Sequence, residues 1–401
     1  MAKYFRLIFI LSLTLSGDTL FSVAVIWTVL LRGGSEKSLA FFLCIVTLVA
    51  FLIQRLSKRF KQALEKAPGK SFIAIRVAGV ICSLGLLVAS KHQALWLLYF
   101  SGMLFTVISF LSQITVEAII GQEVLSGRLS SNKASRILQT ALQISAFLGA
   151  ALTGFVLNFG GMAAVLAVNA VTYASGMLIF FTLRHTAALH ADNQKDQKPA
   201  HEQLSLNKHR LVLWLSFIGL CFLMLQVSAF NFLVPLIAQH EKAWTATEFG
   251  FIDALAGLGA FMCTLLSTER GWKSMLWAMA FLIIPISDAA FHFGSNAYWV
   301  AIAAGFIGFF ANIFRIKMRE LIYDSVSTAK QIMDWAGRIT VMSTLLKAGA
   351  PLILAFIVLK PSMLFVLVGC VAGGGILIAT ILVVQAFYKP KRSIPIYSVQ
   401  S

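Results

Sequence analysis

The sequence has 401 residues, of which 59% are hydrophobic and only 12% are charged. Soluble domains carry about 25% charged residues, so the composition excludes an ordinary soluble protein and indicates a membrane protein with many spans. The formal net charge of +17 does not require a nucleic-acid partner, because its distribution follows membrane topology.

Twelve apolar segments follow one another along the chain, and most are long enough to cross a bilayer as a helix. They cover residues 5–31, 38–54, 71–90, 94–119, 138–158, 162–183, 211–238, 246–267, 273–293, 297–318, 336–359 and 362–388. The sequence therefore predicts an all-α polytopic membrane protein with twelve transmembrane helices.

The first apolar segment contains one carboxylate, Asp18, near its middle. A charge at the centre of a bilayer costs about 2.5–3.5 kcal/mol, and intramembrane carboxylates commonly have a function. We expect Asp18 to bind a proton or to contact a substrate. The alternative is a structural aspartate that is hydrogen-bonded to Ser16 or Thr19.

A polar stretch, residues 184–210, separates the sixth and seventh apolar segments and shows no apolar periodicity. It is typical of a flexible linker, and its four histidines lack the regular spacing of metal ligands. We expect three regions: an N-terminal six-helix bundle (1–187), a cytoplasmic linker (188–208), and a C-terminal six-helix bundle with a short cytoplasmic tail (209–401).

Lysine and arginine gather in alternate loops. If the N-terminus lies in the cytoplasm, the outer loops hold only Arg32, Lys37, Lys91, Lys242 and Lys360. This asymmetry predicts that both termini are cytoplasmic. It also suggests that Arg76, Arg315, Lys317 and Arg319 extend their charges toward the inner membrane surface.

Short stretches of the two halves match at offsets of 202 to 204 residues: 6–12 with 210–216, 116–120 with 319–323, and 135–137 with 337–339. The second and third matches bring an acid and a base to corresponding places in each half. We expect the pairs Glu117–Arg136 and Glu320–Arg338 to form a cytoplasmic gate. The alternative is structural pairing without gating.

The duplication and several motifs resemble the major facilitator superfamily. Within it, the sequence is similar to the bacterial efflux branch that includes macrolide exporters and enterobactin-type siderophore exporters. The motifs are Ser16-Gly17-Asp18 with Trp27, Gly149 with Gly154, and residues 169–173. The resemblance implies two six-helix bundles in a bacterial inner membrane, with a substrate cavity between them.

Polar residues at middle depth are the candidates for such a cavity. Lys347 is the second deeply placed charge, and Asp253 is a third; with Asp18 they are the candidates for proton and substrate coupling. Whether Asp18 pairs with Lys347 stays open. Four further residues are predicted to line the cavity, with helix packing as the alternative for each: Gln226, Asn231, Phe110 and Phe230.

The sequence thus predicts a proton-coupled secondary transporter that exports a small molecule and works as a monomer in the lipid bilayer. Lys347 favours an anionic metabolite such as a siderophore. The alternatives are efflux of lipophilic or cationic drugs, or import by the same fold. No Walker motif and no metal-ligand spacing occur, so neither an enzyme, a metal site nor a cofactor is expected.

Overall fold

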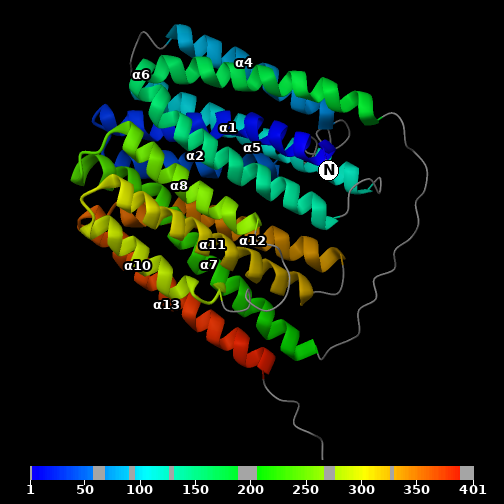
Figure 1. The fold of residues 1–401 in the computed structure, drawn as a ribbon, viewed down its shortest axis with the longest axis vertical. Coiled ribbons are helices and arrows are strands. Elements are labelled where there is room, and N and C mark those ends of the chain that lie inside the picture. Colours follow the sequence, from blue (N-terminus) through cyan, green and yellow to red (C-terminus); the bar gives the residue numbers. More distant parts are fainter. Residues whose placement is uncertain are drawn as a thin grey trace, which may run out of the picture.

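A computed structural model describes residues 2–56, 68–89, 95–125, 131–187, 206–265, 276–325 and 329–388 (Figure 1). Within these ranges eleven α-helices and one π-helix are present, and eight helices are long and apolar enough to cross a membrane. The helices are α1 (Ala2–Leu31), α2 (Glu36–Leu56), α4 (Pro68–Ala89), α5 (Leu95–Leu125), α6 (Ser131–Ala187), α7 (Leu206–Leu236), η2 (Ile237–Glu241), α8 (Ala246–Leu265), α10 (Ala280–Phe293), α11 (Ala297–Asp324), α12 (Ala329–Leu354) and α13 (Pro361–Tyr388).

Helix α6 contains two of the predicted segments. They are separated by Gly161, whose backbone angles (φ 60°, ψ −160°) are not helical. A positive φ is readily adopted only by glycine, so this residue lets the chain turn without a loop. With α6 counted as two spans, each of the twelve predicted segments overlaps a described helix, and the predicted all-α polytopic fold is confirmed.

The helices before and after the predicted linker pack mainly among themselves (Figure 1). Most of the contact between these halves comes from two helix pairs: α6 packs along α8, and α2 packs along α12. Glycine permits the first contact, because a Cβ atom on Gly250 of α8 would lie 2.9 Å from the carbonyl oxygen of Ala150 in α6. Small residues allow such close approach between membrane helices. Most of the linker, residues 188–205, lies outside the described residues.

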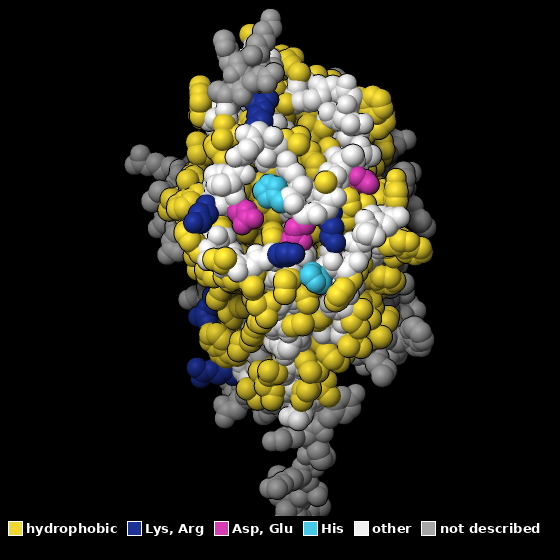
Figure 2. Space-filling view, turned by 90° about the vertical axis from the view of Figure 1, so that its left-hand side faces the viewer, with side chains coloured by type: hydrophobic (Ala, Val, Ile, Leu, Met, Phe, Trp, Pro, Cys, Tyr) yellow, Lys and Arg dark blue, Asp and Glu magenta, His cyan; other side chains and the backbone are white. Residues whose placement is uncertain are grey.

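The end of the bundle where α1 ends and α2 begins is called the far end here. At this end the ring of Trp27 in α1 stacks on Phe249 of α8 at 5.0 Å, and the hydroxyl of Thr247 donates to the carbonyl oxygen of Gly154 at 3.4 Å. Figure 2 shows this end with charged and histidine side chains at its centre and hydrophobic side chains around them. The two halves therefore touch at the far end in this conformation.

Candidate functional site

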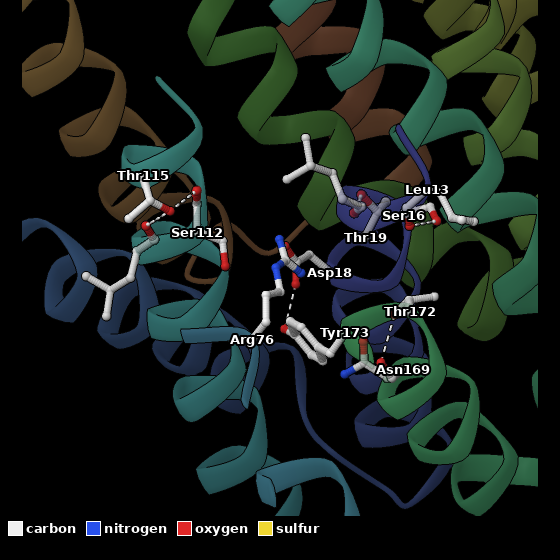
Figure 3. Close-up of polar contacts among 12 residues, drawn as sticks. Leu13, Ser16, Asp18, Thr19, Arg76, Ser112, Thr115, Asn169, Thr172 and Tyr173 are labelled. Carbon is white, nitrogen blue, oxygen red and sulfur yellow. Dashed lines mark hydrogen bonds and ion pairs between the residues drawn. The ribbon is translucent and has the colours of Figure 1, made fainter. Parts of the chain in front are cut away.

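Asp18 lies midway along α1, and its side chain is only 6% exposed. Tyr173 of α6 donates a hydrogen bond of 2.6 Å from its hydroxyl to Oδ1 of Asp18. Nη2 of Arg76, from α4, lies 3.8 Å from Oδ2 of the same carboxylate. Figure 3 shows the three side chains pointing toward one another from three helices. They form one buried polar site in the N-terminal half.

The position of Arg76 differs from the one that the sequence predicted. Its side chain is fully buried, and its guanidinium lies 5.0 Å from the ring centre of Phe72 and 4.9 Å from that of Tyr173. The interpretation that it extends toward the membrane surface is therefore wrong. A buried guanidinium is tolerated only with a compensating charge and polar contacts, and Asp18 supplies that charge.

The backbone around Asp18 is held by close packing of α1 on α6. A Cβ atom on Gly149 would lie 2.6 Å from the carbonyl oxygen of Ser16, so only glycine fits there. One turn farther along α6, the hydroxyl of Thr153 donates to the carbonyl oxygen of Leu20 at 3.0 Å. The site is therefore positioned by rigid helix contacts rather than by a loop.

The structure does not support the alternative that Ser16 or Thr19 holds the carboxylate. The Ser16 hydroxyl donates to the carbonyl oxygen of Leu13 at 2.8 Å, and that of Thr19 donates to Leu15 at 3.5 Å. Both bonds stay within their own helix. Asp18 instead joins three helices of the N-terminal half.

A cavity of about 90 Å³ opens beside Asp18 between α1, α2 and α5. Its polar wall includes Ser22, Thr106 and Ser109. Phe105 adds an apolar wall. The volume has room for a few water molecules beside the buried carboxylate.

Lys347 does not belong to the Asp18 site and lies in the C-terminal half. It is exposed on α12, and the charges that act on it are those of Arg315 and Arg319 in α11. Among the described residues the ion-pair partner of Asp18 is Arg76, not Lys347. The two charges singled out in the sequence therefore belong to separate clusters, one in each half.

Two predicted cavity residues lie in the core of the C-terminal half. Gln226 is fully buried, and its Nε2 donates to Oδ2 of Asp288 in α10 at 2.7 Å. The ring of Phe230 is 7% exposed and packs against Phe291 and Phe365, with ring centres 6.1 Å away in each case. Both side chains are buried in this conformation, and their place in a substrate cavity stays a prediction.

The remaining predicted cavity and coupling residues are more open. Asn231 is exposed although its neighbours in α7 are buried, and Phe110 is half-buried on α5. Asp253 of α8 is also half-buried. It lies one turn after Phe249, which stacks on Trp27 of α1, so Asp253 lies on the side of α8 that faces the other half.

Of the two predicted gate pairs, only Glu320–Arg338 has described side chains, and these two are not paired with each other. Nζ of Lys317, not Arg338, lies 3.2 Å from Oε2 of Glu320. The guanidinium of Arg338 lies over Trp335 at 4.8 Å. The side chains of Glu117 and Arg136 fall outside the described residues.

Sequence reasoning missed Arg76 and Tyr173 as partners of Asp18. Arg76 is close to the start of its apolar segment, which favoured a membrane-surface position. Tyr173 gave no signal beyond its place in the motif of residues 169–173. Within the described residues, no group of three or more histidine, cysteine or acidic side chains could hold a metal ion.

Comparisons with known proteins agree with this architecture. A family model described as "Major Facilitator Superfamily" matches residues 127–333. No curated protein sequence matches the chain.

Among solved structures, a bacterial homologue of the iron transporter ferroportin in an inward-facing state is 17% identical, with a TM-score of 0.66 over 96% of this chain and 98% of that one. A bacterial metal transporter is 15% identical, with a TM-score of 0.64 over 97% and 99%. A bacterial homologue of the human lysosomal transporter Spinster is 12% identical, with a TM-score of 0.58 over 96% and 94%. At these identities the likeness concerns the fold, and the resemblance to macrolide and siderophore exporters stays a prediction.

Proposed function

Because this chain belongs to the major facilitator superfamily, a family of membrane transporters and not of enzymes, we propose that it carries a small organic anion across the membrane in exchange for protons. Secondary transport follows from the family. The proton, the anion and the exchange are the proposal, and each is argued below from side chains of this chain.

The observation that carries the proposal is the buried site of Asp18, Arg76 and Tyr173. With Asp18 ionised, its charge balances that of Arg76 at 3.8 Å. When Asp18 takes up a proton, the guanidinium loses this compensation in a place where charge is costly. Protonation therefore changes the energy of the packed helices α1, α4 and α6, as a driving ion must.

A proton drives transport only if the inward-open and outward-open states bind it differently. Helix α1 offers a physical link for such a difference. It holds Asp18, and nine residues later its Trp27 stacks on Phe249 of the other half. This separation is about 14 Å along one continuous helix, so a shift of α1 at the proton site also acts on the contact between the halves.

The charge on the other half favours an anionic substrate. Lys347 is exposed and lies among like charges. Such a side chain attracts anions and repels the cationic drugs that the sequence left as an alternative. Export is the direction that the resemblance predicts, and it is part of the proposal.

Transport of a divalent cation is the second candidate, because the similar solved structures include an iron-transporter homologue and a metal transporter. The surroundings of Asp18 do not favour divalent-cation transport by this chain. A fixed guanidinium 3.8 Å from the carboxylate repels a metal ion. We therefore rank the organic anion first.

Proteoliposomes distinguish these candidates. Three probes are compared with and without a pH gradient: citrate as an organic anion, tetraphenylphosphonium as a lipophilic cation, and Mn²⁺ as a metal ion. We expect the gradient to drive accumulation of citrate alone, with the direction read from the side on which citrate is supplied. Asp18→Asn should still exchange citrate without a gradient but lose gradient-driven accumulation. Gradient-driven accumulation equal to wild type in this variant would remove Asp18 from the mechanism.

A further inference from the structure

Lys347 lies on the inner side of α12. The exposed side chain of Leu345 is two residues away, about 200° around the helix, and therefore marks the opposite, outer side. One turn before Lys347, the hydroxyl of Ser343 contacts the sulfur of Met224 in α7 at 3.6 Å, and one turn after it Pro351 is buried. The ammonium group is thus exposed to the interior between helices rather than to lipid.

Two arginines of α11 act electrostatically on Lys347 of α12, and both helices contribute to one hydrophobic cluster. Arg315 and Arg319 are four residues apart and so share one face of the helix. Their charges act on Lys347 and on each other. Nε of Arg315 is buried and has no hydrogen-bond partner among the described residues. The three side chains therefore concentrate like charge, and at least one donor is left unused.

Three described carboxylates of the C-terminal half are engaged elsewhere, and Asp253 lies on the side of α8 that faces the other half. Glu320 pairs with Lys317 on another face of α11, and Asp288 accepts from Gln226. Glu241 accepts from the backbone N–H of Ser362 at 2.8 Å. Uncompensated charge inside a membrane protein is costly and commonly marks a ligand site.

We infer that Lys347, Arg315 and Arg319 form a binding site for a polycarboxylate anion on the inner face of the C-terminal half. The inference rests on the proposed function and specifies its substrate class. Two arginine forks and one ammonium, contributed by two helices, match several separate carboxylates better than one. The inward position of Lys347 favours a dissolved anion over an anionic lipid headgroup.

Equilibrium binding of citrate to the purified full-length protein in phosphatidylcholine nanodiscs tests the inference, with acetate as the monocarboxylate control. Calorimetry should show saturable citrate binding and much weaker acetate binding. Lys347→Gln and Arg315→Gln should each weaken citrate binding about tenfold or more, as expected for one lost charge-assisted hydrogen bond. Lys347→Arg should retain most of the affinity.

Lys317→Gln is the matched control, because Lys317 has the same charge as Lys347 and lies in the helix of Arg315 and Arg319, but pairs with Glu320. It should change citrate affinity less than twofold, which excludes a general effect of net charge. Each variant should elute and melt as a folded protein before its affinity is compared. Equal affinity losses in Lys317→Gln and Lys347→Gln, or no citrate binding by the wild type, would overturn the inference.

Two further outcomes distinguish the anion site from a lipid-headgroup site and from proton coupling. Loss of citrate binding when phosphatidylglycerol is added to the nanodiscs would assign the site to a lipid headgroup and overturn the inference. Proton coupling is a separate matter, because this assay uses no gradient. If Asp18→Asn binds citrate as the wild type does while gradient-driven transport is unaffected, the proposed coupling fails and the anion site stands.

Discussion

Replacing Asp18 by Asn, Arg76 by Gln, and both together tests whether the buried pair is energetically coupled. Two unit charges 3.8 Å apart interact by about 4 kcal/mol at an effective dielectric constant of about 20. Each single replacement leaves one buried charge without this compensation, which costs about 3–5 kcal/mol. The double replacement leaves neither charge. We therefore expect the double variant to lose clearly less stability than the two single variants lose in sum.

Thermal unfolding in detergent measures the four proteins of this cycle. The exposed pair Lys317–Glu320, with side chains 32% and 53% exposed, provides a matched cycle on the surface of α11. Its coupling should be about 0–1 kcal/mol, because solvent screens exposed pairs. If the Asp18 and Arg76 effects are additive, the two residues act independently and the described site has no energetic basis.

Two further replacements test the packing around the site and between the halves. Tyr173→Phe removes the hydrogen bond to Asp18 and should destabilise the protein by about 1.5–3 kcal/mol. Tyr99→Phe, whose hydroxyl is buried with no hydrogen-bond partner among the described residues, should be neutral or stabilising in the same melting assay. Gly250→Ala forces a methyl group against α6 and should speed amide hydrogen exchange at the start of α8; Gly349→Ala, which meets nothing within 4 Å, should leave that exchange unchanged.

The fold class was predictable because hydropathy is a local property. Each apolar segment predicts its own helix independently of the rest of the chain. The break between the two segments that form α6 was also local, since Gly161 lies in the gap between them. The depth of Asp18 was equally local, because the centre of a long apolar run is the centre of the bilayer.

The partners of Asp18 were not predictable, because pairing depends on which helices pack and how each is rotated. Arg76 is the sixth residue of its apolar segment, but α4 begins at Pro68 and turns the guanidinium inward. Gln226 illustrates the same limit on α7. A polar side chain in a membrane helix satisfies its hydrogen bonds equally well in a cavity or against a buried acid, and here Asp288 is that acid.

The central claim is that proton transfer at Asp18 is tied to movement of the substrate. A pH-sensitive dye inside proteoliposomes measures this directly, when citrate is added outside and no pH gradient is imposed. The wild type should move protons in step with citrate, and Asp18→Asn should exchange citrate with no proton signal. Equal proton movement in the two proteins would contradict the claim.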